Sequence, residues 1–132
     1  MLFFWWVIMM KESGENYLET ILQLEKKNQI IRSVDIANAL GVTKPSVSRA
    51  MRVLKRDGYI EQESYGDVTL TEKGRQRASD VLKRHRIISK FFVDILEVDE
   101  KTADTDACRI EHVISPCTIA KMDHYIKSHL EK

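Results

Sequence analysis

The sequence predicts a mainly α-helical protein in which a winged helix-turn-helix is followed by an all-helical region. The first observation is a pair of short helical segments, 34–40 and 44–56, separated by little more than Gly41 and Val42. Two helices joined by so tight a turn, with Gly in it, form a helix-turn-helix. The second observation is a hairpin pattern directly after this pair. The third is a run of amphipathic segments that continues to the end of the sequence.

Cap and stop residues set the expected limits of the first helices. The earliest helix is predicted to begin after a Ser13 cap and to stop near Asn28. Ser33 and Thr43 are the expected N-caps of the helix-turn-helix, whose second helix ends at Arg56. In the earliest helix, apolar residues recur at helical spacing, at Tyr17, Leu18, Ile21, Leu22 and Leu24.

Two short segments with strand character, 59–63 and 68–70, flank the turn-rich tetrapeptide 64–67. This pattern predicts an antiparallel hairpin. A hairpin that follows a helix-turn-helix is the wing of a winged helix. Acidic residues surround its tip, so the wing is a weaker candidate for nucleic-acid contact than the helix before it.

Three helices are predicted after the wing. Thr71 is the expected cap of a long helix that continues to about Leu96, and a second helical stretch covers about 105–114. Ser115 is the expected cap, and Pro116 the first residue, of a last helix that continues almost to the end of the sequence.

The first ten residues are all apolar and contain both tryptophans. They are too few to cross a bilayer, which takes about 20 residues, and they lack the basic start and cleavage site of a secretory signal. One interpretation is that translation starts at Met9 or Met10, and the alternative is an apolar extension of the first helix. We therefore expect three parts: an extension at 1–9, a winged helix-turn-helix DNA-binding domain at 10–74, and a helical metal-binding and dimerisation domain at 75–132.

Length and composition bound the kinds of protein to expect. The 132 residues include 21 Lys and Arg against 20 Asp and Glu, and 43% are hydrophobic. These values are typical of a compact globular chain and exclude a disordered, collagen-like or multidomain protein. Two Cys are too few for a disulfide scaffold, so a cytoplasmic location is expected. The first 90 residues are net basic and the rest net acidic, so the first part is the better partner for a polyanion.

The second helix of the helix-turn-helix carries five basic residues within 13 positions. In this motif the second helix enters the major groove, and its N-terminal residues reach the base edges. Residues near its start are therefore expected to face bases, and the basic residues further along to meet phosphates. The alternative is a solvated helix face. The DNA-binding candidates are Thr43, Lys44, Pro45, Ser46, Ser48, Arg49, Arg52, Lys55 and Arg56.

A thiol, a carboxylate and an imidazole recur at Cys108, Glu111 and His112. Positions i, i+3 and i+4 share one face of a helix, so the three groups are expected to converge. Together they are a ligand set for a transition metal, and the alternative is that they serve capping and packing. Cys117 lies beyond the Pro116 break and is expected to be a buried small hydrophobe.

Several short motifs follow one another in a fixed order from about Gly14 to Lys132. They are Asn16 to Ile21, Val34 to Ala37, Leu40 to Val42, Pro45 to Ser48, Leu70 to Gly74, Arg84 to Arg86, and Ala107 to Ser115. With these motifs the chain resembles the DtxR/MntR family of metal-dependent bacterial transcriptional repressors. Several motifs are shared with other winged helices, whereas the His85 block and the block from Cys108 to Ser115 are specific.

The resemblance implies a metal site with ligands from three helices. At the position of Asn16 the manganese branch has Asp and the iron branch Met, and at Cys108 the manganese branch has Glu and the iron branch Cys. Glu19 matches the manganese branch. The implied ligands are Glu19 with Asn16, His85, and Cys108, Glu111 and His112.

The predicted ligand set does not indicate a single metal. A thiolate favours Fe²⁺, Co²⁺, Ni²⁺ or Zn²⁺, because hard Mn²⁺ gains little from sulfur, whereas carboxylates and imidazoles suit Mn²⁺ or Fe²⁺. We expect Mn²⁺ or Fe²⁺ as the physiological ion, with Zn²⁺, Co²⁺ or Ni²⁺ able to bind in vitro. Because the sequence stops at Lys132, we expect the short, manganese-type form without the extra C-terminal domain of the iron-type proteins.

The resemblance implies a metal-activated repressor of metal-uptake genes. It would bind double-stranded DNA as a homodimer on a (pseudo)palindromic operator, with no membrane partner. One alternative is a winged-helix regulator that responds to an oxidant or another ligand through Cys108. A small metalloenzyme is the other, but the sequence has no nucleophile elbow, no phosphate loop and no separate acid–base pair, so we expect no enzyme.

Three smaller expectations concern the helical region. Asp104 could add a carboxylate to a second metal, although a helix N-cap or a solvated acid is the simpler interpretation. His124 and His129 are expected at the surface. An apolar face of the long helix predicts dimerisation, and the alternative is that it fills the monomer's own core; its residues are Ile87, Ile88, Phe91, Phe92, Ile95 and Leu96.

Overall fold

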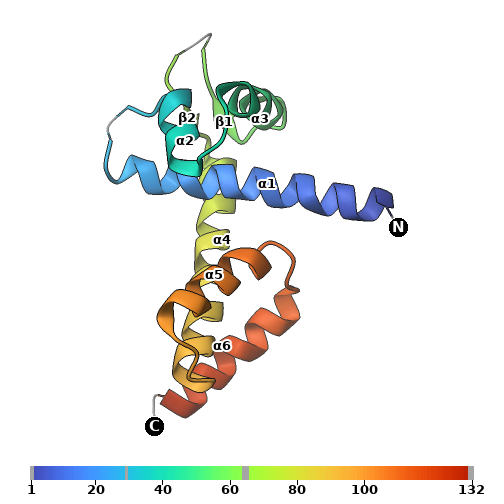
Figure 1. The fold of residues 1–132 in the computed structure, drawn as a ribbon, viewed down its shortest axis with the longest axis vertical. Helices are drawn as coiled ribbons and strands as arrows, with labels where there is room; N and C mark the ends of the chain where they lie inside the picture. Colours follow the sequence, from blue (N-terminus) through green and yellow to red (C-terminus); the bar gives the residue numbers. More distant parts are fainter. Residues whose placement is uncertain (1, 29, 64–65, 131–132) are drawn as a thin grey trace. The chain divides into compact units, whose positions relative to one another are not determined.

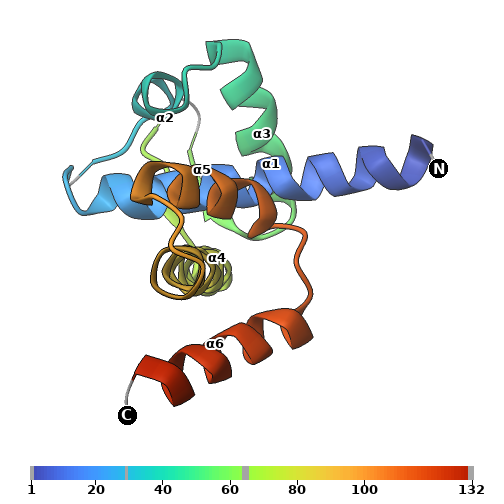
Figure 2. The ribbon, with the colours of Figure 1, turned by 60° about the horizontal axis from the view of Figure 1, so that its bottom comes forward.

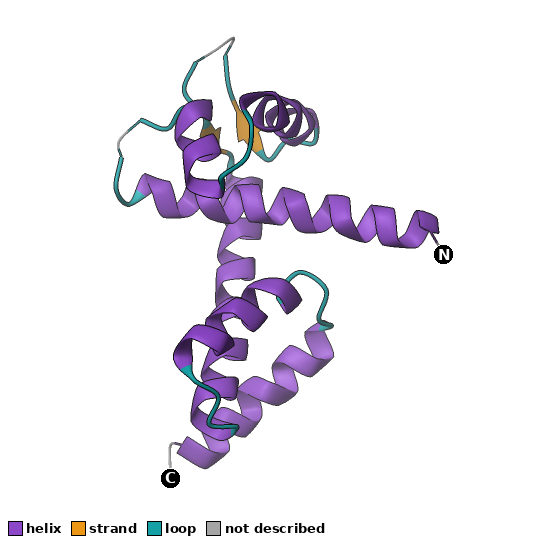
Figure 3. Cartoon of the chain, viewed as in Figure 1, coloured by secondary structure: helices purple, strands orange, loops and turns teal. Residues whose placement is uncertain are grey.

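A computed structural model describes residues 2–28, 30–63 and 66–130, with only the backbone for 2–13. The chain divides into two compact units, 1–79 and 80–132, and both this division and the predicted one after residue 74 lie within one helix. The mainly helical fold class is confirmed (Figures 1 and 3). Its elements are α1 (Leu2–Glu25), α2 (Ser33–Leu40), α3 (Lys44–Arg56), β1 (Ile60–Glu61), β2 (Thr69–Leu70), α4 (Glu72–Lys90), the π-helical η1 (Phe91–Ile95), α5 (Glu100–Ile110) and α6 (Pro116–Leu130).

Helix α1 begins earlier than the sequence predicts. It starts at Leu2, so the expected cap at Ser13 is wrong, because that residue lies inside an uninterrupted helix (Figure 2). The apolar start of the chain thus has helical backbone. None of the helices in the described part of the chain is long and apolar enough to cross a membrane.

The first unit has one apolar core, to which every element of the winged helix contributes. Helix α2 packs on both α1 and α3. Gly41 ends α2 with φ 68°, a left-handed conformation that Gly adopts without strain. The turn to α3 is therefore as tight as predicted, and the helix-turn-helix is confirmed. The buried residues of this core include Leu18, Ile21, Ile36, Val47, Met51, Ile60 and Val68.

The start of α2 differs from the prediction. Ser33 is the first helical residue rather than the cap, and Arg32 occupies the cap position with extended backbone. The amide of Arg32 donates to Oδ2 of Asp35 at 2.9 Å, so a carboxylate inside the first turn satisfies the end of the helix. The Ser33 hydroxyl is left for another partner, Nε2 of Gln62 at 3.2 Å.

The wing is a two-stranded antiparallel hairpin. Ile60 pairs with Leu70 and Glu61 with Thr69, so the strands are shorter than the predicted 59–63 and 68–70. Residues 64 and 65 at its tip lie outside the described residues. The amide of Val68 donates at 2.8 Å to the carbonyl of Ile31, a residue before α2. A backbone amide that bonds elsewhere cannot extend the ladder, which explains the short strands.

The first turn of α4 lies directly against the wing. Thr71 is its cap as predicted, with Oγ1 accepting from the amide of Gly74 at 3.1 Å. A Cβ at Gly74 would lie 1.9 Å from the carbonyl oxygen of Tyr59, which is far inside van der Waals contact. Only glycine therefore fits where α4 meets β1.

The helices of the second unit also depart from their expected limits. The long helix was predicted to reach Leu96, but its last turn is π-helical, with the amide of Leu96 bonded to the carbonyl of Phe91 at 3.2 Å. Helix α5 begins at Glu100, not near residue 105, because Oδ2 of Asp99 accepts from the amide of Thr102 at 2.9 Å and caps it. It ends at Ile110, four residues before the predicted end.

The last helix agrees with its prediction. Ser115 accepts from the amide of Thr118 through Oγ at 3.2 Å, and Pro116 is the first helical residue. His124 and His129 on this helix are exposed, as expected. Ile88, by contrast, is completely buried in the protomer's own core, so its predicted place on a dimer face is wrong.

Candidate functional site

Helix α3 separates its apolar and polar residues onto opposite faces. Val47, Met51 and Leu54 are buried in the core of the first unit. A helix anchored along one stripe presents its other face to solvent. That face holds all of the DNA-binding candidates: Thr43, Lys44, Pro45, Ser48, Arg49, Arg52, Lys55 and Arg56 are exposed, and Ser46 is half-buried.

Three polar side chains meet at the start of α3. Thr43 caps the helix, with Oγ1 accepting from the amide of Ser46 at 3.3 Å, and the two hydroxyls lie 2.9 Å apart. Nη2 of Arg49 donates to Oγ of Ser46 at 3.5 Å. Hydroxyl and guanidinium groups at this end of a recognition helix are suited to the edges of bases.

The basic residues at the other end of α3 differ in what they contact. Nζ of Lys55 donates to the backbone oxygen of Gln62 at 2.6 Å. Nε of Arg56 pairs with Oδ1 of Asp57 at 3.1 Å. Both groups thus have a protein partner, although both side chains are exposed and keep further donors.

In the second unit, the ring of His85 lies between two carboxylates. Nδ1 is 2.7 Å from Oε2 of Glu111, and Nε2 is 2.8 Å from Oδ1 of Asp104. These neighbours raise the pKa of His85 to about 9: the hydrogen bond to Glu111 contributes most, burial opposes it, and Asp104 adds to the rise. The imidazole is therefore held by negative charge on both sides.

Glu111 combines complete burial with an unsatisfied oxygen. Its side chain is 0% exposed. Among the side chains that the structure describes, Oε1 of Glu111 is the buried polar atom that has no hydrogen-bond partner. Nε2 of His112, which is also buried, lies 3.2 Å from that oxygen without the alignment of a hydrogen bond. A buried carboxylate oxygen in this state is costly, and a cation satisfies it. Oε1 of Glu111 and the imidazole of His112 therefore suit a divalent metal.

The remaining predicted ligands are Asn16, Glu19 and Cys108. Asn16 and Glu19 lie on α1, in the first unit. Cys108 is exposed. The amide of Glu111 still bonds the carbonyl of Ala107 at 2.9 Å, so helical geometry continues to Glu111, and the convergence of Cys108 with Glu111 and His112 stays a prediction.

The expectation for Cys117 is wrong. Cys117 is exposed rather than buried, because it is the second residue of α6 and that end of the helix faces solvent. Asp104 is not an N-cap, since it lies inside α5, but its side chain is exposed, as the interpretation as a solvated acid expected, and it bonds His85.

Sequence reasoning missed the residue that orients Glu111. Nε of Arg84 donates to the backbone oxygen of Glu111 at 2.7 Å. Arg84 and His85 are adjacent on α4, so one turn of this helix contacts both the backbone and the side chain of Glu111. The Arg84-His85-Arg86 motif indicated that this part of α4 matters, but the sequence does not show that Arg84 and His85 both contact Glu111.

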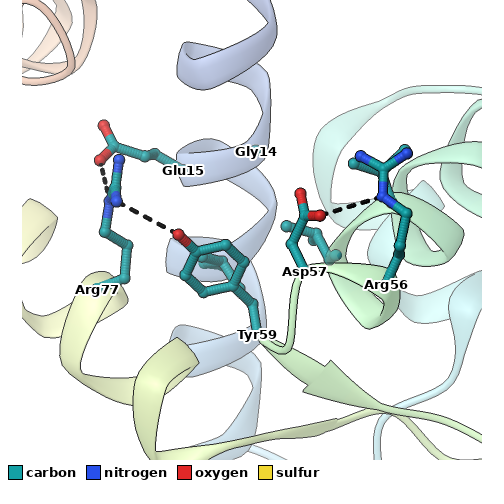
Figure 4. A pocket seen from close by; sticks show the side chains of 9 residues that line it. Gly14, Glu15, Arg56, Asp57, Tyr59 and Arg77 are labelled. Atoms are coloured by element: carbon teal, nitrogen blue, oxygen red, sulfur yellow. Dashed lines mark hydrogen bonds and ion pairs between the residues drawn. The ribbon is translucent and has the colours of Figure 1, made fainter.

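The first unit contains a separate cavity of about 250 Å³ beside α1, lined in part by Leu18, Leu54 and Tyr59. Figure 4 shows Glu15 and Arg77 side by side at its edge. Nε of Arg77 lies 2.6 Å from Oε2 of Glu15, whose side chain is 3% exposed, and Nη1 lies 3.5 Å from the hydroxyl of Tyr59. This ion pair joins α1 to the start of α4.

Family comparisons cover nearly the whole chain. The N-terminal DNA binding domain of iron dependent repressors matches residues 9–68, and the metal binding and dimerisation domain of iron dependent repressors matches 71–131. The chain belongs to the DtxR/MntR family of metal-dependent transcriptional repressors. The resemblance seen in the sequence motifs is thereby confirmed.

Individual relatives agree with this membership. An uncharacterised helix-turn-helix-type transcriptional regulator of Methanocaldococcus jannaschii is 35% identical over 124 residues, 93% of this chain and 99% of its own length. The iron-dependent repressor IdeR of Mycobacterium tuberculosis is 34% identical over 104 residues, which cover 79% of this chain and 45% of IdeR. The chain thus spans about half the length of this repressor.

A solved relative has the same fold. A manganese-dependent transcriptional repressor in complex with manganese is 26% identical, with a TM-score of 0.79 over 86% of this chain and 52% of that one.

Proposed function

We propose that this chain is a metal-activated, homodimeric repressor that works in the cytoplasm on genes for metal-ion uptake. Membership of a family of metal-dependent DNA-binding regulators supports the general function. The observation that carries the metal response is the buried Oε1 of Glu111, which lacks a hydrogen-bond partner within the described residues and lies beside His112, while Oε2 holds His85.

DNA binding would use the exposed face of α3. The hydroxyls of Thr43 and Ser46 and the guanidinium of Arg49 would meet base edges, with Pro45 and Ser48 beside them. Lys44 and Arg52 would meet phosphates. A homodimer would present two such helices to a two-fold symmetric, (pseudo)palindromic operator.

Metal binding would use His85, Glu111 and His112 of the second unit. Glu19, Asn16 and Cys108 are added from the family resemblance. A bound divalent ion would supply the positive charge that satisfies the buried carboxylate. Two imidazoles and carboxylates suit Mn²⁺ or Fe²⁺.

Metal binding would activate DNA binding because the two equilibria are linked through the conformation of the protein. An ion that binds the DNA-competent conformer more tightly than the other conformers raises the population of that conformer, and hence the operator affinity. His85 lies on α4 and Glu111 is the residue that caps the end of α5, so a ligand that both contact restricts how α4 and α5 move against each other.

A second candidate function is supported by the exposure of Cys108. An accessible thiol can be oxidised, whereas a buried one is inert. A regulator of this kind would bind its operator equally with and without a chelator, and hydrogen peroxide would change that binding. Cys108→Ser would abolish the peroxide effect.

The experiment that separates the two is an operator-binding titration with Mn²⁺, Fe²⁺, Zn²⁺ and Co²⁺, before and after chelation. The proposal predicts a gain in affinity with Mn²⁺ or Fe²⁺ that the chelator reverses. Equal affinity throughout would overturn it.

A further inference from the structure

Gln62, which follows β1 in the wing, makes three hydrogen bonds to three different parts of the first unit. Its amide nitrogen donates to Oγ of Ser33 at 3.2 Å and to the carbonyl of Gly66 at 3.0 Å. Its backbone oxygen accepts from Nζ of Lys55 at 2.6 Å. Both protons of the amide are therefore used, and the side chain is half-buried.

These partners lie on the elements that a winged helix must keep in register. Ser33 is the first residue of α2, Lys55 is in the last turn of α3, and Gly66 is on the returning arm of the wing. One residue thus touches both helices of the helix-turn-helix and both arms of the hairpin.

The wing needs such a support because its own ladder is short. Within the described part of the wing, two residue pairs form the strand ladder, Ile60–Leu70 and Glu61–Thr69. An isolated two-stranded hairpin is marginal in water, so contacts outside the ladder must hold it. The bond from Val68 to Ile31 supports one arm, and the Gln62 contacts support the other.

We propose that Gln62 and Lys55 are positioning residues that fix the wing against the helix-turn-helix, and that Lys55 is a strut rather than a phosphate contact. This inference rests on the proposed DNA binding. The sequence assigns Lys55 to phosphate because it is basic and lies on α3. In the structure, however, its ammonium bonds a carbonyl of the wing.

Salt dependence distinguishes the two roles of Lys55. Each lost phosphate contact lowers the slope of log affinity against log salt by about 0.9 in magnitude. Arg52 is exposed on the same helix and serves as the matched control. We expect Arg52→Met to lower the slope by that amount. Lys55→Met should leave the slope unchanged while weakening binding by about two- to tenfold, the range for a lost hydrogen bond.

Gln62→Met provides the second arm of the experiment, because methionine keeps the length of the side chain and removes both donors. It should weaken operator binding with an unchanged slope. Combined with Lys55→Met it should cost little more than either change alone, since both disrupt one support. Gln23→Met, at an exposed position of α1, should bind as the unmodified protein does.

The outcomes are distinct. If the unmodified protein fails to bind DNA with any metal, the proposed function is wrong. If it binds and Lys55→Met lowers the slope as Arg52→Met does, the positioning role of Lys55 is wrong. The positioning role is also wrong if the affinity of the double variant falls by the product of the two single effects. If Gln62→Met fails to fold, as judged by its thermal transition, the slope of Lys55→Met alone decides.

Discussion

The two units of this protein hold their candidate functional groups in opposite ways. In the first unit the groups are exposed on α3, and an apolar stripe beneath them fixes their orientation. In the second unit the main groups, Glu111 and His112, are buried, and their position depends on α4 and α5 meeting correctly. The orientation of the exposed groups thus depends on one helix, whereas the position of the buried polar groups depends on the packing of two helices.

This difference predicts where substitutions act. A change on the exposed face of α3 should alter DNA binding and leave stability and metal binding alone, because the side chains make few contacts within the protein. A change among the buried groups of the second unit should alter metal binding, and with it the regulation of the other unit.

The largest effect is expected at Glu111. Glu111→Gln keeps the size of the side chain and removes its charge, so affinity for Mn²⁺ should fall at least about tenfold, as ligand and outer-shell substitutions commonly do. Asp106→Asn, at an exposed position of α5, is the matched control. Calorimetric titration of both variants measures the effect. Equal affinities in the two variants would exclude Glu111 as a ligand.

The second-largest effect is expected from a substitution at the contact between α4 and the wing. Gly74→Ala forces a methyl group into the carbonyl of Tyr59 and should destabilise the first unit by about 1–3 kcal/mol, the usual cost of overpacking. Ser79→Ala, at an exposed position of the same helix, should cost far less. Urea unfolding of both variants checks this, and an unchanged midpoint for Gly74→Ala would show that the contact can relax.

On α3 the effect should depend on position. Arg49→Ala is expected to relax base preference at one position of each half-site by about 1–3 kcal/mol, whereas Arg52→Ala should weaken binding similarly on all sequences. A panel of mutated operators separates the two. The same uniform loss for both variants would remove Arg49 from the base edges.

The smallest effect is expected at Cys117. Because its thiol is exposed, Cys117→Ser should change the free energy of unfolding by less than about 0.5 kcal/mol, as is usual for surface substitutions. It should also leave the metal response intact. A large drop in the melting temperature would mean that the thiol is packed in the assembled protein.

The same contrast explains what could be predicted from the sequence. In the first unit, α2 and α3 follow from local signals, such as the Gly41 turn, the Thr43 cap and the stripe of Val47 and Met51, so the sequence locates them almost to the residue. The errors in this unit are the shorter wing strands and the caps at Ser13 and Ser33, where a good capping residue lies inside a helix that other residues begin.

In the second unit the decisive contacts join residues far apart in sequence. The family resemblance named His85, Glu111 and His112, but the pairing of His85 with Asp104 and of Arg84 with Glu111 depends on how α4 and α5 pack. The limits of α5 also differ from the predicted 105–114, because Asp99 caps it earlier and it ends at Ile110. Local periodicity cannot predict where a helix stops when no strong stop residue is present.

We propose a division of labour in which the buried groups of one unit would sense the metal and the exposed helix of the other would read DNA. The most direct test is the ratio of operator affinity with saturating Mn²⁺ to that with chelator, measured for the unmodified protein, Glu111→Gln and Arg49→Ala. The account predicts a ratio near one for Glu111→Gln. For Arg49→Ala it predicts an unchanged ratio, with lower affinity in both conditions. A preserved ratio in Glu111→Gln, or a lost one in Arg49→Ala, would contradict it.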